Sequence, residues 1–158
     1  MSITVETTKL IVEYLQSIFP NAESRRSYLS TLEPDELDEI GKPVFLVAPV
    51  DRDAEKYNQG GLQKNSLTID ICINAKLHYR NAEPVELTAE IDGLIAFAET
   101  VYSAFLKKVV KDAKNLKAAF DQPEHVVLLD SEIFQDRNCF LSVVRVNAEV
   151  FAKPEVLS

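Results

Sequence analysis

The chain has few of the residues from which disulfide-stabilised domains, metal sites and phosphate-binding loops are built. Its 158 residues include only two cysteines, Cys72 and Cys139, and four glycines. Two cysteines are too few for a disulfide framework or a zinc site, so we expect a protein that folds in a reducing cytoplasm. No glycine-rich turn joins a strand to a helix, so a phosphate-binding loop is unsupported. We therefore expect neither a metal nor another cofactor.

Long apolar runs and a basic leader are also missing. No segment approaches the roughly 20 apolar residues of a membrane-spanning helix, so no membrane contact is expected. The N-terminal sequence MSITVETTKLIVEYL contains acidic residues and lacks a small-residue cleavage site, which argues against a secretory signal. Positive charge is scarce as well. The net charge of −8, from 25 acidic and 17 basic residues, argues against sequence-independent binding of nucleic acid.

What the chain does have is the composition of a globular protein and one very regular strand. With 46% hydrophobic and 27% charged residues, it is predicted to form a single domain over residues 1–158. Apolar and polar side chains alternate through residues 66–78, SLTIDICINAKLH. One face of this strand carries Leu67, Ile69, Ile71, Ile73, Ala75 and Leu77. The other face carries Thr68, Asp70, Cys72, Asn74, Lys76 and His78. The pattern predicts an antiparallel sheet covered on one side, whose polar side meets water, a ligand or another copy of the protein.

Two segments have the periodicity of amphipathic helices. The first is predicted to begin after an N-cap at Thr4 and to end before Pro20, which cannot continue a helix. The second begins near Pro84 and carries an apolar stripe from Leu87 to Leu106. We expect this longer helix to cover the apolar face of the strand at 66–78.

Three further strands are predicted, at residues 43–49, 125–130 and 139–151, the first of them at or near a sheet edge because prolines bound it. The sequence therefore predicts an α+β fold. Its sheet is expected to be mainly antiparallel, with about four strands covered on one face by two helices, in the order helix, strand, strand, helix, strand, strand.

Two segments fall outside this pattern. Residues 21–42 are polar and include an acidic run at 33–39, so we favour a solvated surface segment, with at most a short helix after Pro34, over a dedicated binding arm. Residues 50–65 have mixed charge and a Gly-Gly pair, which favours a flexible loop that projects between two strands.

No recognisable active site emerges from the remaining polar residues. His78 and His125 each lie at the end of a predicted strand, without a second ligand at metal-binding spacing. Asp51 and Asp53 flank an arginine, and a solvated charge cluster is the simpler interpretation. The lysines near the end of the second helix are likewise attributed to solvent exposure rather than to phosphate binding. They are Lys107, Lys108, Lys111, Lys114 and Lys117. We therefore predict that the protein is not an enzyme.

The order of these elements resembles a known family. An amphipathic N-terminal helix is followed by KPVFLVAPVDRD, a loop ending in NSLTIDICINAKL, the helical ELTAEIDGLIAFAETVYSAFL and a closing strand FLSVVRVNAEVF. Over residues 4–151, this order and spacing resemble the tail terminator proteins (tail completion or minor tail proteins) of tailed bacteriophages. The resemblance implies a virion protein, assembled in the cytoplasm of the host bacterium. It would form a ring, commonly a homohexamer, that caps the tail tube and joins it to the head–tail connector. That cap would end tube polymerisation, and DNA would pass through the lumen without specific binding.

A ring also suggests where contacts lie. In a cyclic assembly one surface of each subunit meets a different surface of the next. The loop at 50–65 and the polar face of the strand at 66–78 are our candidates for contacts with a neighbouring subunit or the tail tube. The candidate residues are Arg52, Lys56 and Tyr57 in the loop, and Asp70, Asn74 and Lys76 on the strand.

Two alternatives remain open. The acidic run and the net charge suit a small inhibitor or immunity-type protein that binds a basic enzyme or DNA-binding protein, with strongly salt-dependent affinity. An enzyme with an unrecognised site is the other alternative, and it would use His78 together with Asp70 on the polar strand face.

Overall fold

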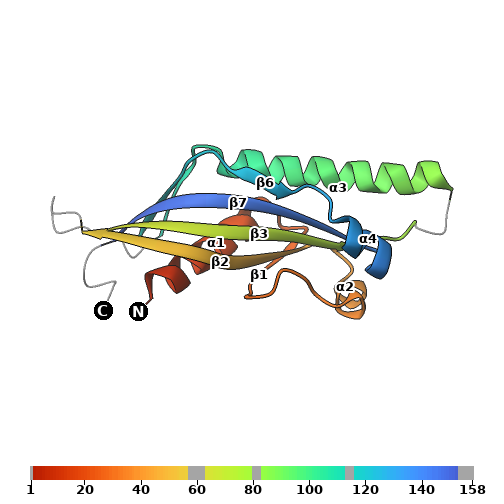
Figure 1. Ribbon diagram of the computed structural model, residues 1–158, viewed down its shortest axis with the longest axis horizontal. Coiled ribbons are helices and arrows are strands. Elements are labelled where there is room, and N and C mark those ends of the chain that lie inside the picture. Colours follow the sequence, from red (N-terminus) through yellow and green to blue (C-terminus); the bar gives the residue numbers. More distant parts are fainter. Residues whose placement is uncertain (1, 57–62, 80–82, 113–115, 153–158) are drawn as a thin grey trace.

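The computed structural model describes residues 2–56, 63–79, 83–112 and 116–152. Within these ranges the chain forms four helices and seven strands (Figure 1). In chain order they are α1 (Ile3–Ile18), β1 (Glu23–Arg26), α2 (Pro34–Ile40), β2 (Val44–Lys56), β3 (Gln63–Lys76), α3 (Pro84–Phe105), β4 (Val109–Lys111), β5 (Lys117–Phe120), β6 (Glu124–Val127), α4 (Ser131–Arg137) and β7 (Cys139–Ala152).

The strands form one curled sheet that resembles half a barrel (Figure 1). Their order is β1-β2-β3-β7-β5-β4, and β6 pairs with another part of β7. Since β1 runs parallel to β2 while every other described pair is antiparallel, the sheet is mixed. The α+β class is right, but the prediction of about four antiparallel strands covered on one face by two helices is wrong. The short strands β1, β4 and β5 are too brief to show the alternation by which β3 was found, and helices cover parts of both faces.

Two long strands that are consecutive in the chain, β2 and β3, form a twisted hairpin. β2 and β3 pair from Val44 opposite Asn74 to Lys56 opposite Gln63. Residues 50–56 and 63–65, which we expected in a projecting loop, therefore continue the strands. A bulge between Pro49 and Asp51 shifts the register. Residues 50–56 thus belong to a strand because their main chain pairs with β3, although their side chains alone do not favour a strand.

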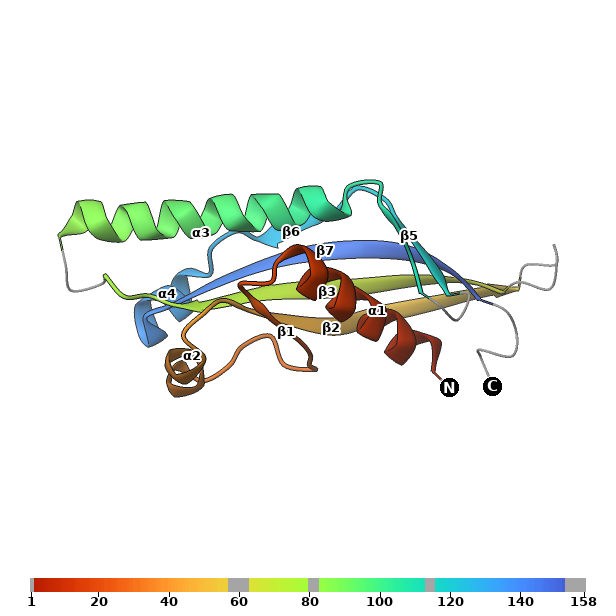
Figure 2. The same cartoon turned by 180° about the vertical axis from the view of Figure 1, so that it is seen from behind.

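The main core lies between the inner face of the sheet, defined as the face that carries α1 and α3, and those two helices (Figures 1 and 2). Phe45 of β2 stacks on Phe97 of α3 at 5.5 Å between ring centroids, and Phe19 packs against both rings. The Tyr14 hydroxyl of α1 donates a hydrogen bond of 2.7 Å to the carbonyl of Ala104 in α3. The longer helix α3 therefore lies over the inner face of the sheet and shares one core with the apolar residues of β3.

A second, smaller core lies on the opposite, outer face. Its buried residues are Leu37, Val44, Leu46, Cys72, Cys139, Leu141 and Val143. Leu37 comes from α2, and the half-buried Ile133 of α4 packs against the same cluster. The polar face predicted for β3 is therefore covered at its C-terminal half, because two short helices and the segment before α2 lie across it.

Local signals set the limits of these helices. Ser2, not Thr4, caps α1, and its hydroxyl accepts the amide of Val5 at 3.3 Å. Pro34 opens α2, and Gly41 closes it with a φ of 72°, which favours glycine. The Asp130 carboxylate accepts the Ile133 amide at 3.0 Å and so begins α4.

Candidate functional site

The half of the outer face nearer the β2–β3 hairpin is open and polar. Side chains of β3 and β7 meet there across the strands. The Thr68 hydroxyl donates to Asn147 Oδ1 at 3.0 Å, and Lys64 Nζ lies 3.3 Å from Glu149 Oε1. A cavity of about 330 Å³ opens beside this row, next to β5. Its polar lining residues are Ser66, Thr68, Asp121, Asn147 and Glu149. This half of the face is consistent with the predicted polar surface.

Asp70 of the candidate set is held by Arg145, which is its direct partner in the β3–β7 register. Arg145 Nε and Nη2 donate to the two carboxylate oxygens at 2.8 and 3.1 Å. The hydrogen bond to Asp70 raises the pKa of the guanidinium. The Asp70 side chain is 17% exposed and that of Arg145 is 32% exposed. Any partner that approaches here therefore meets a neutralised pair rather than a free carboxylate.

Asn74 and Lys76 lie under the second core rather than in the open region. Asn74 is only 1% exposed, and its Nδ2 donates to the carbonyls of Ser30 at 3.0 Å and Cys72 at 3.3 Å. It thereby fixes the segment before α2 to the sheet. Lys76 is half-buried and stands opposite Cys139. Burial raises the pKa of the Cys139 thiol, and the nearby charge of Lys76 partly opposes this effect. A contact by Asn74 with another chain stays a prediction, but its amide is already used within this one.

The candidates from the predicted loop lie on or beyond β2. Arg52 is exposed, and its Nε and Nη2 donate to Asn65 Oδ1 at 3.2 and 2.9 Å. The backbone of Lys56 pairs with Gln63 at the end of β2, while its side chain is outside the described residues. Tyr57 also lies outside the described residues. Only Arg52 of the three therefore has a known side-chain environment.

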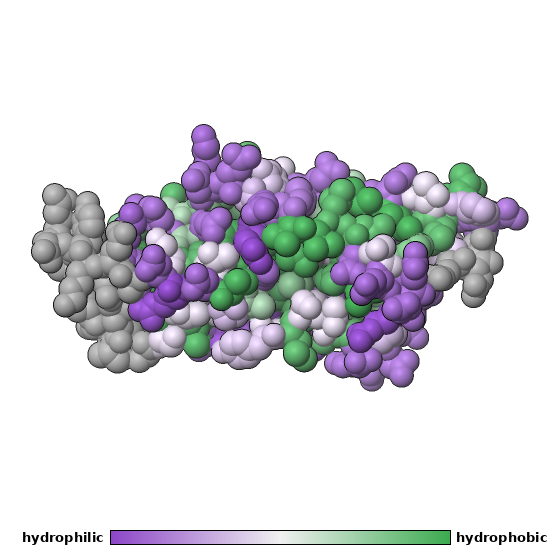
Figure 3. Space-filling view, in the orientation of Figure 1, coloured by the Kyte–Doolittle hydropathy of each residue, from purple (hydrophilic) through white to green (hydrophobic). Residues whose placement is uncertain are grey.

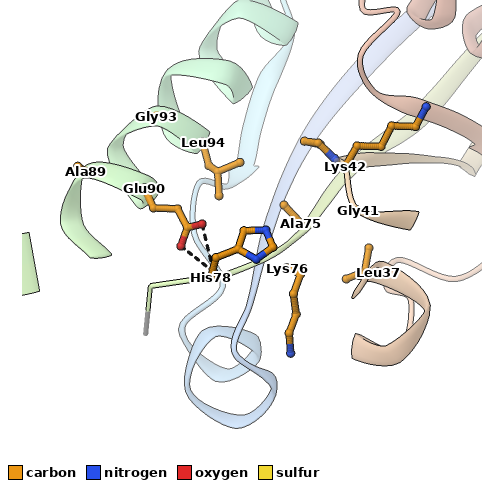
Figure 4. A pocket seen from close by; sticks show the side chains of 11 residues that line it. Leu37, Gly41, Lys42, Ala75, Lys76, His78, Ala89, Glu90, Gly93 and Leu94 are labelled. Carbon is orange, nitrogen blue, oxygen red and sulfur yellow. Dashed lines mark hydrogen bonds between the residues drawn. The ribbon is translucent and has the colours of Figure 1, made fainter. Parts of the chain in front are cut away.

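A groove opens at the other end of the molecule, between α2, the end of β3 and the first half of α3 (Figure 4). It holds about 340 Å³. The lining residues are Leu37, Gly41, Lys42, Pro43, Ala75, Lys76, His78, Ala89, Glu90, Gly93 and Leu94. The Glu90 carboxylate accepts the backbone amides of His78 at 3.0 and 3.1 Å and of Tyr79 at 3.3 Å. Glu90 thus ties α3 to the end of the sheet.

The structure does not bring His78 together with Asp70. Eight residues of extended chain separate them, or about 26 Å at the usual rise of a strand. The other histidine, His125, stacks on Tyr102 of α3 at 4.8 Å between ring centroids. Among the described residues, no group of three or more histidine, cysteine or acidic side chains is placed to hold a metal ion. None of the helices in those same ranges is long and apolar enough to cross a membrane.

No model of a known protein family matches this chain, and no curated protein sequence matches it.

The first half of α3 is only partly covered by the rest of the subunit. None of residues 84–97 is buried, and this half of the helix extends past the end of the sheet (Figures 1 and 2). Val85 is 74% exposed and Tyr79, just before the helix, 47%. Figure 3 shows a continuous hydrophobic area between α3 and α4. Exposed apolar surface of this kind is typical of a site that another molecule covers.

Sequence reasoning missed two residues that organise these surfaces. Arg145 interrupts the apolar run of β7, and a charged residue in such a strand signals a partner on the neighbouring strand. Glu90 lies near the start of a helix, where an acidic residue is favoured by the helix dipole alone, but its carboxylate accepts backbone amides that are 11 and 12 residues away. Only the strand pairing and the helix position reveal these two roles.

Proposed function

We propose that this chain is a structural protein of a phage tail that forms a ring, caps the tail tube and joins it to the head–tail connector. The observation that carries the proposal is the overhanging first half of α3, where none of residues 84–97 is buried and Val85 is 74% exposed. Such a surface needs a partner. Because the order of elements resembles that of tail terminator proteins, the proposed partners are other copies of this chain and the neighbouring proteins of the tail.

The β2–β3 hairpin supports a contact with the tube. It extends at the end of the molecule opposite the overhanging helix (Figure 1). Asp51 and Asp53 are exposed, and the register places them opposite Thr68 and Ser66 on the outer face. A subunit with unlike surfaces at its two ends suits a heterologous, head-to-tail assembly rather than a two-fold dimer. In the ring, DNA would pass a wall of mostly acidic chains without being held.

The test uses the full chain mixed with the tail tube protein of the same phage. We expect rings by negative-stain electron microscopy and tubes that stop growing once capped. The double variant Asp51→Lys/Asp53→Lys should stay folded, as judged by circular dichroism, and cap at least tenfold fewer tubes. Glu13→Lys, an exposed charge reversal on α1, is the matched control and should cap normally. Tubes of unchanged length, together with no ring in the presence of tube protein, would refute the proposal.

The acidic inhibitor remains the second candidate, and α2 favours it. The acidic residues of this helix and its N-cap, Glu33, Asp35, Glu36, Asp38 and Glu39, are all exposed. They form a compact negative surface that a basic partner could recognise. This function requires no self-assembly, so a protein that stays monomeric at high concentration but binds a basic protein at low salt would favour it over the ring.

A further inference from the structure

The ribbon formed by β4 and β5 carries an unfavourable arrangement of charge. Lys111 and Lys117 are direct cross-strand partners and both are exposed. Like charges placed opposite one another destabilise a strand pair. Among the described residues, neither lysine forms a salt bridge. Val109 lies two residues before Lys111 on the same face of the ribbon and is 45% exposed. An apolar side chain flanked by unpaired lysines is therefore presented at the edge of the sheet.

The turn before β4 adds to this surface. Lys107 has a φ of 51°, in the left-handed region that is unfavourable for a residue with a side chain. Both Lys107 and Lys108 are exposed. The amide of Phe120 donates to the carbonyl of Lys108 at 2.8 Å, which holds the turn in place. The chain thus keeps two further lysines beside the ribbon in a fixed, strained turn.

The groove between α2, the end of β3 and α3 has features that complement the β4–β5 ribbon. Its floor includes the apolar side chains of Leu37, Ala75 and Leu94. The exposed Asp38 precedes the lining residue Gly41 by three positions, and the exposed Glu86 precedes the lining residue Glu90 by four. Glu86 and Glu90 share a face of α3, and Asp38 directly follows the lining residue Leu37 in α2, so both exposed carboxylates lie beside residues of the groove wall.

Two lysines and a histidine also line the groove. Figure 4 shows that the side chains of Lys42 and Lys76 run away from the groove and that the imidazole of His78 lies within it. The lysines therefore contribute their stems to the wall, while their ammonium groups lie away from the opening. The rim on the α2 and α3 side remains acidic.

We propose that the groove is the docking site for the β4–β5 ribbon of a second copy of this chain. Val109 enters the apolar groove, and Lys111 and Lys117 meet the rim carboxylates of Asp38 and Glu86. The elements that border the groove, α2 and the first half of α3, lie toward one end of the molecule, and β5 lies toward the other (Figure 2). The contact is thus heterologous and can repeat from copy to copy. It rests on the proposed ring, for which it names the subunit interface.

Charge reversal tests the pairing. The ribbon variant Lys111→Glu/Lys117→Glu and the groove variant Asp38→Lys/Glu86→Lys should each lower self-association at least tenfold in sedimentation velocity. An equal mixture of the two variants should restore it, because each junction then joins opposite charges. Glu99→Lys, an exposed change on α3 outside the groove, should associate as the unchanged chain does. Self-association that stays within twofold in both double variants would overturn the interface.

Cross-linking gives a second measurement. Val109→Cys and Gly93→Cys introduce one thiol on each surface, and a Cβ at Gly93 would meet nothing within 4 Å apart from its own chain neighbours and the backbone of its own helix. The native Cys72 and Cys139 are each 2% exposed and should not react. A short bis-maleimide should link the two variants when they are mixed, and neither variant to itself. If rings form with tube protein but no such link appears, the interface is wrong and the proposed function stands. If the chain forms no ring with tube protein, both proposals fall.

Discussion

Replacing Asn74 tests the cover over the outer face of the sheet. Its amide is 1% exposed and donates to the carbonyls of Ser30 and Cys72. Each hydrogen bond of this kind contributes about 1 kcal/mol net, so Asn74→Ala should lower the free energy of unfolding by about 2 kcal/mol. Asn74→Asp should cost more. It turns a buried donor into a carboxylate that faces two carbonyl oxygens, and an unpaired buried charge costs about 3–5 kcal/mol.

The aspartate variant also has a predicted dependence on pH. Burial without a donor raises the pKa of a carboxyl group above the unfolded value of about 3.9. At pH values below about 3.9 the carboxyl group is neutral in both the folded and the unfolded protein, so stability is retained there. It is lost as the pH rises toward the pKa in the folded protein. The penalty in Asn74→Asp should accordingly be larger at pH 7.5 than at pH 4.

Urea unfolding followed by far-ultraviolet circular dichroism measures these effects, and the chain contains no tryptophan to follow by fluorescence. Asn147→Asp is the matched control. Asn147 is exposed on the open half of the same face, and its Oδ1 accepts the Thr68 hydroxyl. It should change stability by less than about 0.5 kcal/mol. If both Asn74 variants were as mild as this control, Asn74 would be an exposed surface residue and the described cover would be refuted.

Two further predictions concern the cores. Phe45→Ala should destabilise by about 4 kcal/mol, because Phe45 is 0% exposed and touches Phe19 and Phe97. A loss below about 1 kcal/mol in urea unfolding would contradict the packing of this ring. For Cys72, burial, and to a lesser extent the charge of Asp70, raises the pKa of the thiol from 9.0 to about 12. Stability should be complete below pH 9 and fall by up to about 1.4 kcal/mol per unit as the pH rises toward 12, since only the unfolded thiol ionises there. Cys72→Ala should lose less stability between pH 9 and 10.5, and identical slopes for the two proteins would show that the thiol is not buried.

Long elements with strong periodicity could be predicted from the sequence. The apolar stripe of α3 and the alternation of β3 follow directly from the side chains, and the structure has both. The strand β1 could not be predicted, because Glu23–Arg26 has no apolar alternation and exists only through its parallel pairing with β2. The helix α4 does have a signal in the sequence, namely an aspartate, Asp130, at its N-cap and an asparagine, Asn138, at the left-handed position that ends it.

The polar face of β3 shows why alternation predicts a surface but not what lies over it. The same face bears Thr68 in the open half and Asn74 in the covered half. The sequence does not distinguish a buried asparagine, whose amide donates to two carbonyl groups, from an exposed asparagine. The difference depends on where α2 and the residues before it lie, which is a property of tertiary packing. The candidate contacts could therefore be placed on the correct face, but not sorted into free and engaged residues.

The thin cover over the outer face has a consequence for motion. α2 buries only Leu37, and α4 buries no residue at all, whereas the inner face holds a large aromatic core. Segments with so few buried side chains open at lower free energy than the sheet on which they lie. The backbone amides of α2 and α4 should consequently exchange with deuterium long before those of β3 and β7. The molecule thus combines a rigid curved sheet with an end that can loosen by itself, and that end forms one wall of the groove.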